Sequence, residues 1–201
     1  MLVREPERFE IILSHRPYGF YSARWLFILL EKCASSTFVE VLWKRLFWNP
    51  AVIKARYWSP DLPLKRVACH RNPFDRAVST WWSITHKARK NNLAILDAMG
   101  SEDFPAFVRW MVTLHPCSSY SRRSIYCPQT TWLQHIPMSL WLRFEHLNED
   151  FKAAPFSDGL ELPVINSSTH APWQEYYDNE TTALVYEWAK GDFEAFGYEP
   201  N

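Results

Sequence analysis

Residues 25–46, WLFILLEKCASSTFVEVLWKRL, contain the pattern that decides the fold. Their first six residues, 25–30, are apolar, and such a short run is typical of a strand buried on both faces, as in a parallel sheet. From Phe38 onward the apolar residues recur at helical spacing. Residues 35–37, Ser-Ser-Thr, are favoured at the N-cap of a helix. The stretch therefore predicts a strand, a loop of small residues and a helix.

A strand, loop and helix in this order favour the binding of a phosphate. The first N–H groups of a helix have no acceptor within it, and its N-terminal end is positive, so an anion is stabilised there. Lys32 adds a charge at the start of the loop. A nucleotide-kinase P-loop differs, because its lysine ends a glycine-rich loop, and residues 31–37 contain no glycine. An ordinary strand-to-helix turn capped by serine is the alternative.

A second strand and helix meet within residues 65–82. Residues 65–70 are predicted to form a strand, and Arg71 follows it at the edge where open α/β sheets bind their ligands. Asn72 is a favoured N-cap and Pro73 a favoured first helical residue, so a helix is expected to begin here. Arg71 is therefore a candidate for binding an anion.

The length and the charge distribution of the chain indicate how many domains it forms and what kind of ligand it binds. The chain has 201 residues, enough for one domain with a sizeable core. Its 22 basic and 22 acidic residues are unevenly spread, with 16 basic and 8 acidic in residues 1–100, and 6 and 14 in the rest. A general nucleic-acid binder is usually basic throughout, so the basic half suggests a smaller anionic ligand instead.

Targeting segments and cysteines indicate the cellular location of the protein and the redox state of its thiols. No signal peptide or membrane-spanning segment is visible, which predicts a cytoplasmic protein. The four cysteines are too few for a disulfide scaffold, and the sequence leaves open whether Cys117 and Cys127 pair.

The rest of the chain alternates predicted strands and helices. Further strands are expected at residues 9–13, 51–55 and 139–144, and further helices at 104–114, 146–153 and 179–189. This order predicts a single α/β domain over residues 1–201, a P-loop-like three-layer fold with a mostly parallel central sheet flanked by helices.

The two junctions resemble the nucleotide site of sulfotransferases that use 3′-phosphoadenosine 5′-phosphosulfate (PAPS). In that family a loop of the type Pro-Lys-x-x-Gly-Thr-Ser binds the 5′-phosphosulfate, and residues 31–37, EKCASST, resemble it. A second motif, Arg-[Asn/Asp]-Pro-Phe-Asp-Arg-x-x-Ser, binds the 3′-phosphate, and residues 71–79, RNPFDRAVS, match it throughout. The resemblance, to the Golgi-type carbohydrate sulfotransferases and their small bacterial and viral relatives, covers residues 25–200.

The resemblance implies an enzyme, a PAPS-dependent sulfotransferase. It would move a sulfuryl group to a hydroxyl, or in the alternative to an amine, of a small-molecule or glycan acceptor, and release adenosine 3′,5′-bisphosphate. No metal, nucleic acid or membrane anchor is implied, and residues 103–200 are expected to form the acceptor side. Lys32 would also act in catalysis, by neutralising the phosphate left as the S–O bond breaks. The implied nucleotide-binding residues are Lys32, Cys33, Ala34, Ser35, Ser36, Thr37, Arg71 and Ser79.

The chain departs from the family in its loop and in its general base. Glu31 replaces the usual proline and Ser35 the usual glycine of the loop. Many members carry a catalytic His or Glu on the strand after the first helix, but residues 52–57 contain neither. A base must still take the proton of the acceptor. The candidates are His86 and His170, whereas Lys54 or Arg56 could instead stabilise charge.

Two other functions stay open at this point. A P-loop kinase for small molecules would share the strand, loop and helix, but it needs a Gly-Lys-Ser/Thr loop and a carboxylate for magnesium. A module that binds PAPS or a nucleotide without turnover would explain why the usual base is missing.

Overall fold

The structure is a computed structural model. It describes residues 10–14, 25–38, 51–54, 65–87, 89–114, 124–133, 136–157, 162 and 170–200. The chain divides into two compact units, one of residues 1–70 and 133–166 and one of residues 71–132 and 167–201. No helix in the described ranges is both long and apolar enough to cross a membrane.

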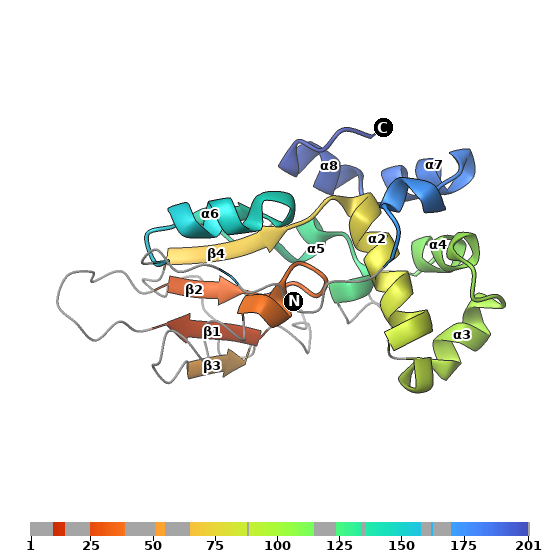
Figure 1. Ribbon diagram of the computed structural model, residues 1–201, viewed down its shortest axis with the longest axis horizontal. Helices are drawn as coiled ribbons and strands as arrows, with labels where there is room; N and C mark the ends of the chain where they lie inside the picture. Colours follow the sequence, from red (N-terminus) through yellow and green to blue (C-terminus); the bar gives the residue numbers. More distant parts are fainter. Residues whose placement is uncertain are drawn as a thin grey trace, which may run out of the picture. The chain divides into compact units, whose positions relative to one another are not determined.

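The first unit is built on a five-stranded sheet in the order β3-β1-β2-β4-β5. Figure 1 labels the first four of these strands in that order. The strands are β1 (Glu10–Ser14), β2 (Trp25–Ile28), β3 (Ala51–Lys54), β4 (Lys65–His70) and β5 (Leu140–Arg143). The bounds of β1, β3, β4 and β5 lie within one residue of the predicted ones, whereas β2 ends two residues before the end of its predicted run, 25–30. The α/β class is therefore confirmed.

The sheet is mixed, because β1 runs against its neighbours. β2, β4 and β5 pair in parallel, whereas β1 pairs antiparallel with both β2 and β3. Residues 15–24, between β1 and β2, are too few for the crossover of a dozen or more residues that a parallel pair requires. Ile28 pairs with Ala68 and His70 with Arg143, so the carboxyl ends of β2, β4 and β5 lie at one edge of the sheet.

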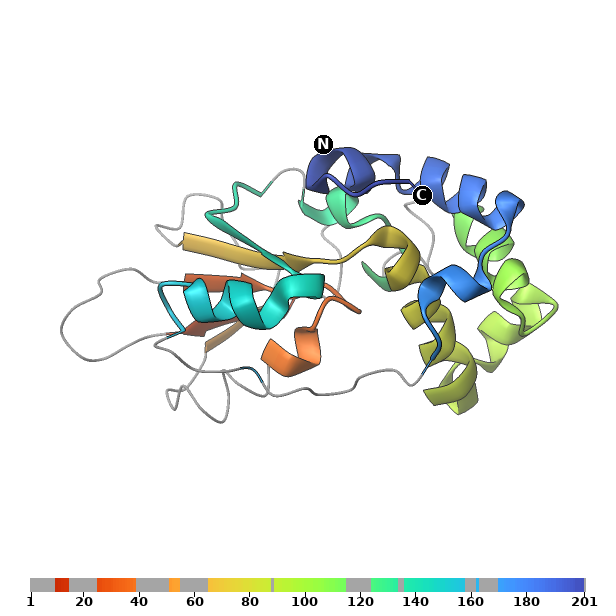
Figure 2. The same cartoon turned by 45° about the horizontal axis from the view of Figure 1, so that its top comes forward.

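Aromatic side chains join this sheet to the helices on its face. Helix α6 (Leu147–Ala153) lies across the sheet, as Figure 2 shows. Phe156 packs edge-on against Trp25 and Phe27 of β2, with ring centroids 5.0 and 4.9 Å apart. Phe38, from the helix after the loop, packs against Phe27 and against Phe151 of α6. These buried rings fix the loop between β2 and its helix at both ends.

The second unit is helical. Its α-helices are α2 (Pro73–Trp82), α3 (Leu93–Met99), α4 (Phe104–Val112), α7 (Asn179–Trp188) and α8 (Lys190–Phe196), with α5 (Gln129–Leu133) beginning in it. Shorter helical turns are η2 (Ser83–Lys87), η3 (Arg89–Asn91), η4 (Ser124–Tyr126) and η6 (Trp173–Tyr176); η5 (Phe144–His146) belongs to the first unit.

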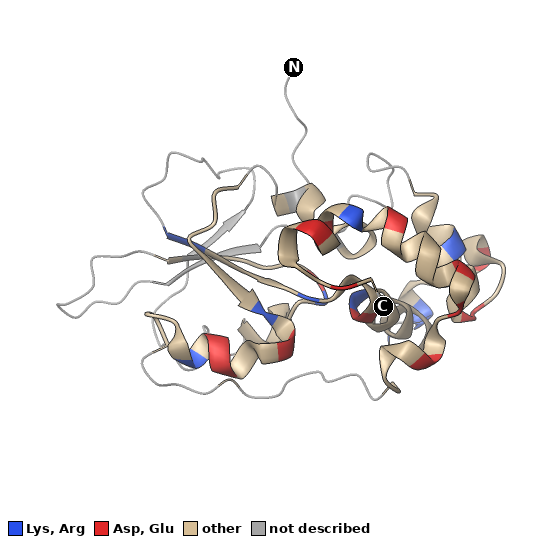
Figure 3. Ribbon diagram, turned by 90° about the horizontal axis from the view of Figure 1, so that it is seen from above, with Lys and Arg blue, Asp and Glu red and all other residues tan. Residues whose placement is uncertain are grey.

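Helix α2 lies in the core of the second unit. Its Phe74 and Val78 are fully buried, together with Phe107 of α4 and Val185 of α7. Basic and acidic residues are interspersed along the helices (Figure 3). One of these pairs, Arg109 with Glu180, joins α4 to α7 through two hydrogen bonds of 2.9 and 2.8 Å. The helices predicted at residues 104–114, 146–153 and 179–189 are confirmed as α4, α6 and α7.

Candidate functional site

The loop after β2 runs directly into a helix, as predicted. Residues 31–34 form a turn and residues 35–38 are helical. The Phe38 N–H donates to the carbonyl oxygen of Ala34 over 3.0 Å, so Ala34 occupies the N-cap position. The prediction that one of residues 35–37 caps the helix is therefore wrong. They form its first turn instead, where backbone N–H groups have no acceptor within the helix.

The turn is built from left-handed residues that are not glycine. Lys32 and Ala34 have φ angles of 67° and 58°, a region that costs a residue with a Cβ about 1–2 kcal/mol. Cys33 between them is buried, and its N–H donates to the Leu30 carbonyl oxygen over 3.2 Å. Ser35 is helical, so glycine's freedom is not needed at that position. Strained backbone of this kind occurs mainly at binding and active sites.

Helix α2 begins at the predicted residue, and it fixes the side chain of Arg71. The Asn72 side chain accepts a hydrogen bond of 2.9 Å from the Phe74 N–H, and Pro73 is the first helical residue. Arg71 Nε donates to Asp75 Oδ2 over 2.8 Å. The pair is largely buried, with 8% of the arginine and 19% of the aspartate side chain exposed. Ser79 lies further along α2 and is also buried.

Sequence reasoning missed two residues that hold the main chain of Arg71. The buried Gln129 side chain accepts from the Arg71 N–H and donates to the Arg71 carbonyl oxygen, both over 2.9 Å. The carboxylate of Asp192, also buried, accepts from Gln129 and Thr130. The sequence signals were indirect: both residues stand in segments that carry the family resemblance, but no role was assigned to them.

His86 is the better placed of the two candidate bases. It lies in η2, a π-helical turn, and such turns are frequent at functional sites. Its ring stacks on Trp82 with centroids 3.7 Å apart. The Thr85 hydroxyl donates to the Trp81 carbonyl oxygen, so its oxygen accepts the hydrogen of His86 Nδ1, 2.7 Å away. Nε2 of this exposed histidine then carries the lone pair that a base requires.

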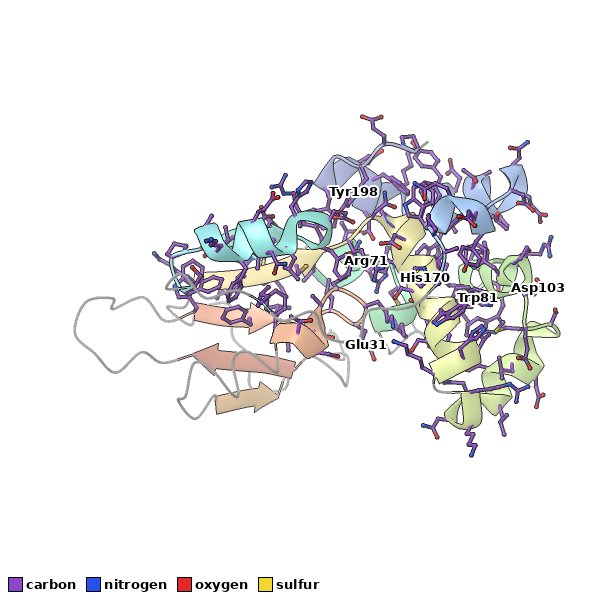
Figure 4. All side chains as sticks on the ribbon, viewed as in Figure 1. Glu31, Arg71, Trp81, Asp103, His170 and Tyr198 are labelled. Carbon is purple, nitrogen blue, oxygen red and sulfur yellow. The ribbon has the colours of Figure 1, made fainter. Side chains whose placement is uncertain are left out.

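His170 contacts the same tryptophan but is covered. Its Nδ1 lies 2.8 Å from the Ala171 carbonyl oxygen and must therefore carry a hydrogen. Nε2 is buried without a hydrogen-bond partner in the structure, where the ring meets Trp82 and Tyr176 edge-on. Figure 4 shows His170 beside α2, along with Trp81. An acceptor would have to displace neighbouring side chains to reach this nitrogen.

A tyrosine completes the packing at the start of α2. The Tyr177 hydroxyl donates to the Phe74 carbonyl oxygen over 3.0 Å. Burial raises the pKa of Tyr177 well above its ordinary value, and the negative charge of Asp75 raises it further. The phenol is therefore neutral at physiological pH and acts as a hydrogen-bond donor.

The other candidate residues can be placed only in part. Arg56 and Cys117 lie outside the described residues, so a role for Arg56 and a bond between Cys117 and Cys127 stay untested. Within the described part of the chain, no group of three or more His, Cys, Asp or Glu side chains is arranged to hold a metal ion.

The predicted site residues thus fall into two sets. The loop residues 32–37 belong to the first unit, and Arg71, Ser79, His86 and His170 belong to the second. Comparisons with family models, with curated proteins and with solved structures found no match to this chain.

Proposed function

We propose that the protein is a PAPS-dependent sulfotransferase that acts on a hydroxyl group, or failing that an amine. The proposal is carried by Arg71, which directly follows a parallel strand and is restrained in both its main chain and its side chain. A guanidinium held in this way suits forked, charge-assisted hydrogen bonds to a phosphate. The motif match over residues 71–79 supports the assignment of that phosphate to the ribose 3′-phosphate of PAPS.

The loop after β2 supports a P-loop-like site for the 5′-phosphosulfate. Residues 35–37 present first-turn N–H groups, and Lys32 lies at the start of the loop. Sulfuryl transfer resembles phosphoryl transfer in what it asks of a protein, because positioning and charge stabilisation dominate. Lys32 then neutralises the charge that develops on the bridging phosphate oxygen as the S–O bond breaks.

His86 serves as the general base in this proposal. The acceptor oxygen attacks sulfur, the bond from sulfur to the 5′-phosphate oxygen breaks, and the acceptor proton passes to His86 Nε2. The products are the sulfated acceptor and adenosine 3′,5′-bisphosphate. Thr85 and the Trp82 ring keep the imidazole in one tautomer and orientation, which a base needs in order to act repeatedly. A carbohydrate acceptor, bound by residues 103–200, follows from the family resemblance.

The proposal is tested by nucleotide-dependent thermal stabilisation, which requires no knowledge of the acceptor. Adenosine 3′,5′-bisphosphate at a hundred times its dissociation constant should add about 2.7 kcal/mol to the stability of the fold. For a chain of this size the melting temperature should rise by roughly 5–10 °C, without added metal. AMP and ATP should raise it much less, because they lack the 3′-phosphate.

Two arginine variants make this test specific. Arg71→Ala should remove most of the preference for the bisphosphate over AMP. Arg109→Ala is the matched control, because Arg109 is an exposed arginine of the same unit whose guanidinium binds Glu180. Stronger stabilisation by ATP with magnesium would favour a kinase instead. Bisphosphate binding without any sulfated product across a panel of acceptors would favour a nucleotide-binding module.

A further inference from the structure

The side chain of Gln129 binds the main chain of the residue that follows β4. The pairing of β4 with β5 runs to His70. At the next residue, Arg71, the main-chain N–H and carbonyl oxygen both bind the Gln129 amide over 2.9 Å. A primary amide can satisfy both groups at once, because it carries a donor and an acceptor side by side. Gln129 is fully buried, so water does not compete for these bonds.

Asp192 fixes the direction in which this amide points. Its Oδ2 accepts from the Gln129 N–H over 2.8 Å and from Gln129 Nε2 over 3.1 Å. Its Oδ1 accepts from the N–H and the hydroxyl of Thr130 over 2.7 and 2.8 Å. Because Nε2 must donate to both Asp192 and the Arg71 carbonyl oxygen, only Oε1 can face the Arg71 N–H. Four donors also compensate the buried carboxylate.

We infer that Gln129, held by Asp192, is a positioning residue that sets the place of Arg71 for the 3′-phosphate. The inference rests on the proposed function. The Arg71 side chain is already tied to Asp75 through Nε, but that bond does not fix the main chain from which the side chain leaves. Forked binding of a phosphate depends on position and angle together. Loosening the main chain should therefore weaken recognition of the 3′-phosphate specifically.

The deciding measurement is the ratio of two affinities. Calorimetry on the full chain gives dissociation constants for adenosine 3′,5′-bisphosphate and for AMP. Gln129→Met removes both bonds to Arg71 while nearly keeping the length of the side chain. We expect the affinity for the bisphosphate to fall by roughly 10- to 100-fold. This is the range for the loss of one hydrogen bond to a charged group, here the bond from the Arg71 guanidinium to the 3′-phosphate. The affinity for AMP should change by less than about threefold, because AMP has no 3′-phosphate.

If Gln129 had a purely structural role, its substitution would lower the melting temperature without changing the ratio of the two affinities. Asp103→Ala is the matched control: it removes the carboxylate that caps α4 by accepting from the Ala106 N–H, so it should lower the melting temperature. It should leave the ratio of the two affinities unchanged. If Gln129→Met also lowers the melting temperature but keeps the ratio, Gln129 only holds the fold together and the inference is overturned.

A second variant of Gln129 is used if the Gln129→Met protein does not fold. If Gln129→Met shows no cooperative melting, Gln129→Asn is measured instead, since it keeps a neutral amide beside Asp192 but is one methylene too short to bind both main-chain groups of Arg71. A folded Gln129→Asn protein with an unchanged ratio, or a failure of both variants to fold, assigns Gln129 to folding alone. A wild-type protein without any preference for the bisphosphate overturns the proposed function itself. A wild-type preference that survives in the Gln129 variant overturns only the inference.

Discussion

The two phosphate-binding elements proposed here fix their backbones in opposite ways. The loop at residues 31–34 is short, and two of its residues are left-handed without being glycine. The junction at residues 71–75 has an ordinary backbone, with a side-chain cap from Asn72 and restraints that Gln129 and Asp75 place on Arg71. The first element stores strain of about 1–2 kcal/mol per left-handed residue, whereas the N-cap of the second contributes about 1 kcal/mol of stability.

This difference separates the expected effects of mutations. In the loop, the groups offered to a ligand are backbone N–H groups and Lys32, so a substitution there should change turnover more than folding. At the start of α2, the hydrogen bonds made by Asn72, Asp75 and Gln129 hold the helix and also orient Arg71. Substitutions there should therefore change stability and nucleotide preference together.

The largest expected effect concerns neither element but the π-helical turn after α2. His86→Gln should lower kcat by roughly 100- to 10,000-fold and remove the acidic limb of the pH–rate profile, because the proposed general base is lost. Nucleotide affinity, measured by calorimetry, should stay within a few-fold. His170→Gln is the control, since Nε2 of His170 is covered. If the His86 variant keeps the acidic limb of the pH–rate profile and the His170 variant loses it, His170 is the general base instead of His86.

The next effect tests the loop. Lys32→Ala should raise the barrier to turnover by roughly 2–4 kcal/mol, because it removes the charge that we propose to stabilise the departing phosphate. Alanine has a Cβ as lysine does, so the cost of the left-handed conformation stays the same. Lys65→Ala, which removes an exposed lysine at the start of β4, serves as the control. Turnover by the Lys32 variant within a few-fold of wild type would show that the loop binds without taking part in the chemical step.

A third effect tests the stability of the junction through pH. The pKa of Tyr177 is raised in the folded protein, whereas an unfolded tyrosine ionises near pH 10. The stability that the protonated Tyr177 contributes is therefore fully present below about pH 10. Above it, stability should fall by up to about 1.4 kcal/mol per pH unit, until the folded pKa is reached.

The Tyr177→Phe variant isolates this contribution. It should lose about 1 kcal/mol at pH 8, because one buried hydrogen bond is removed. Between pH 10 and 11 its stability should fall less steeply than that of wild type, as measured by urea unfolding. Equal slopes in the two proteins would mean that the phenol ionises as readily in the fold as in the unfolded chain.

The sequence predicted the elements whose signals are local. The strand at residues 65–70 and the start of α2 at Pro73 follow from an apolar run, an N-cap residue and a proline that stand side by side. Helices α3 and α8 were missed, because seven residues each show too little periodicity, and Leu93 of α3 is 54% exposed. The antiparallel direction of β1 follows from the number of residues between it and β2, and not from any pattern within the strand itself.

The candidate site was less predictable, because its bonds connect distant residues. Gln129 lies 58 residues from Arg71 and 63 from Asp192, so no local pattern could join them. The orientation of His86 depends on the rotation that a π-helical turn introduces, which helical spacing does not reveal. The left-handed residues of the loop could not be predicted either, since glycine is the residue that normally indicates that conformation.

The smallest expected effect bears directly on that strain. Ala34→Gly relieves a left-handed residue that has a Cβ, a gain of about 1–2 kcal/mol, but adds about 0.5–1 kcal/mol of backbone entropy to the unfolded chain. The free energy of unfolding in urea should therefore rise by roughly 0.5–1 kcal/mol. Ala77→Gly, within α2, should instead lower it by about 1 kcal/mol or more, because glycine disfavours a helix interior and a buried methyl group is lost.

The two alanines thus separate strain from ordinary helix propensity. If Ala34→Gly lowers stability as Ala77→Gly does, Ala34 is not left-handed in solution, and the contrast between the loop and the junction fails. If stability rises while affinity for adenosine 3′,5′-bisphosphate falls, the strain serves binding, because a rigid loop holds its N–H groups in place and glycine loosens it. A gain in stability without any loss of affinity would mean that the strain is a cost the loop tolerates for its tight turn alone.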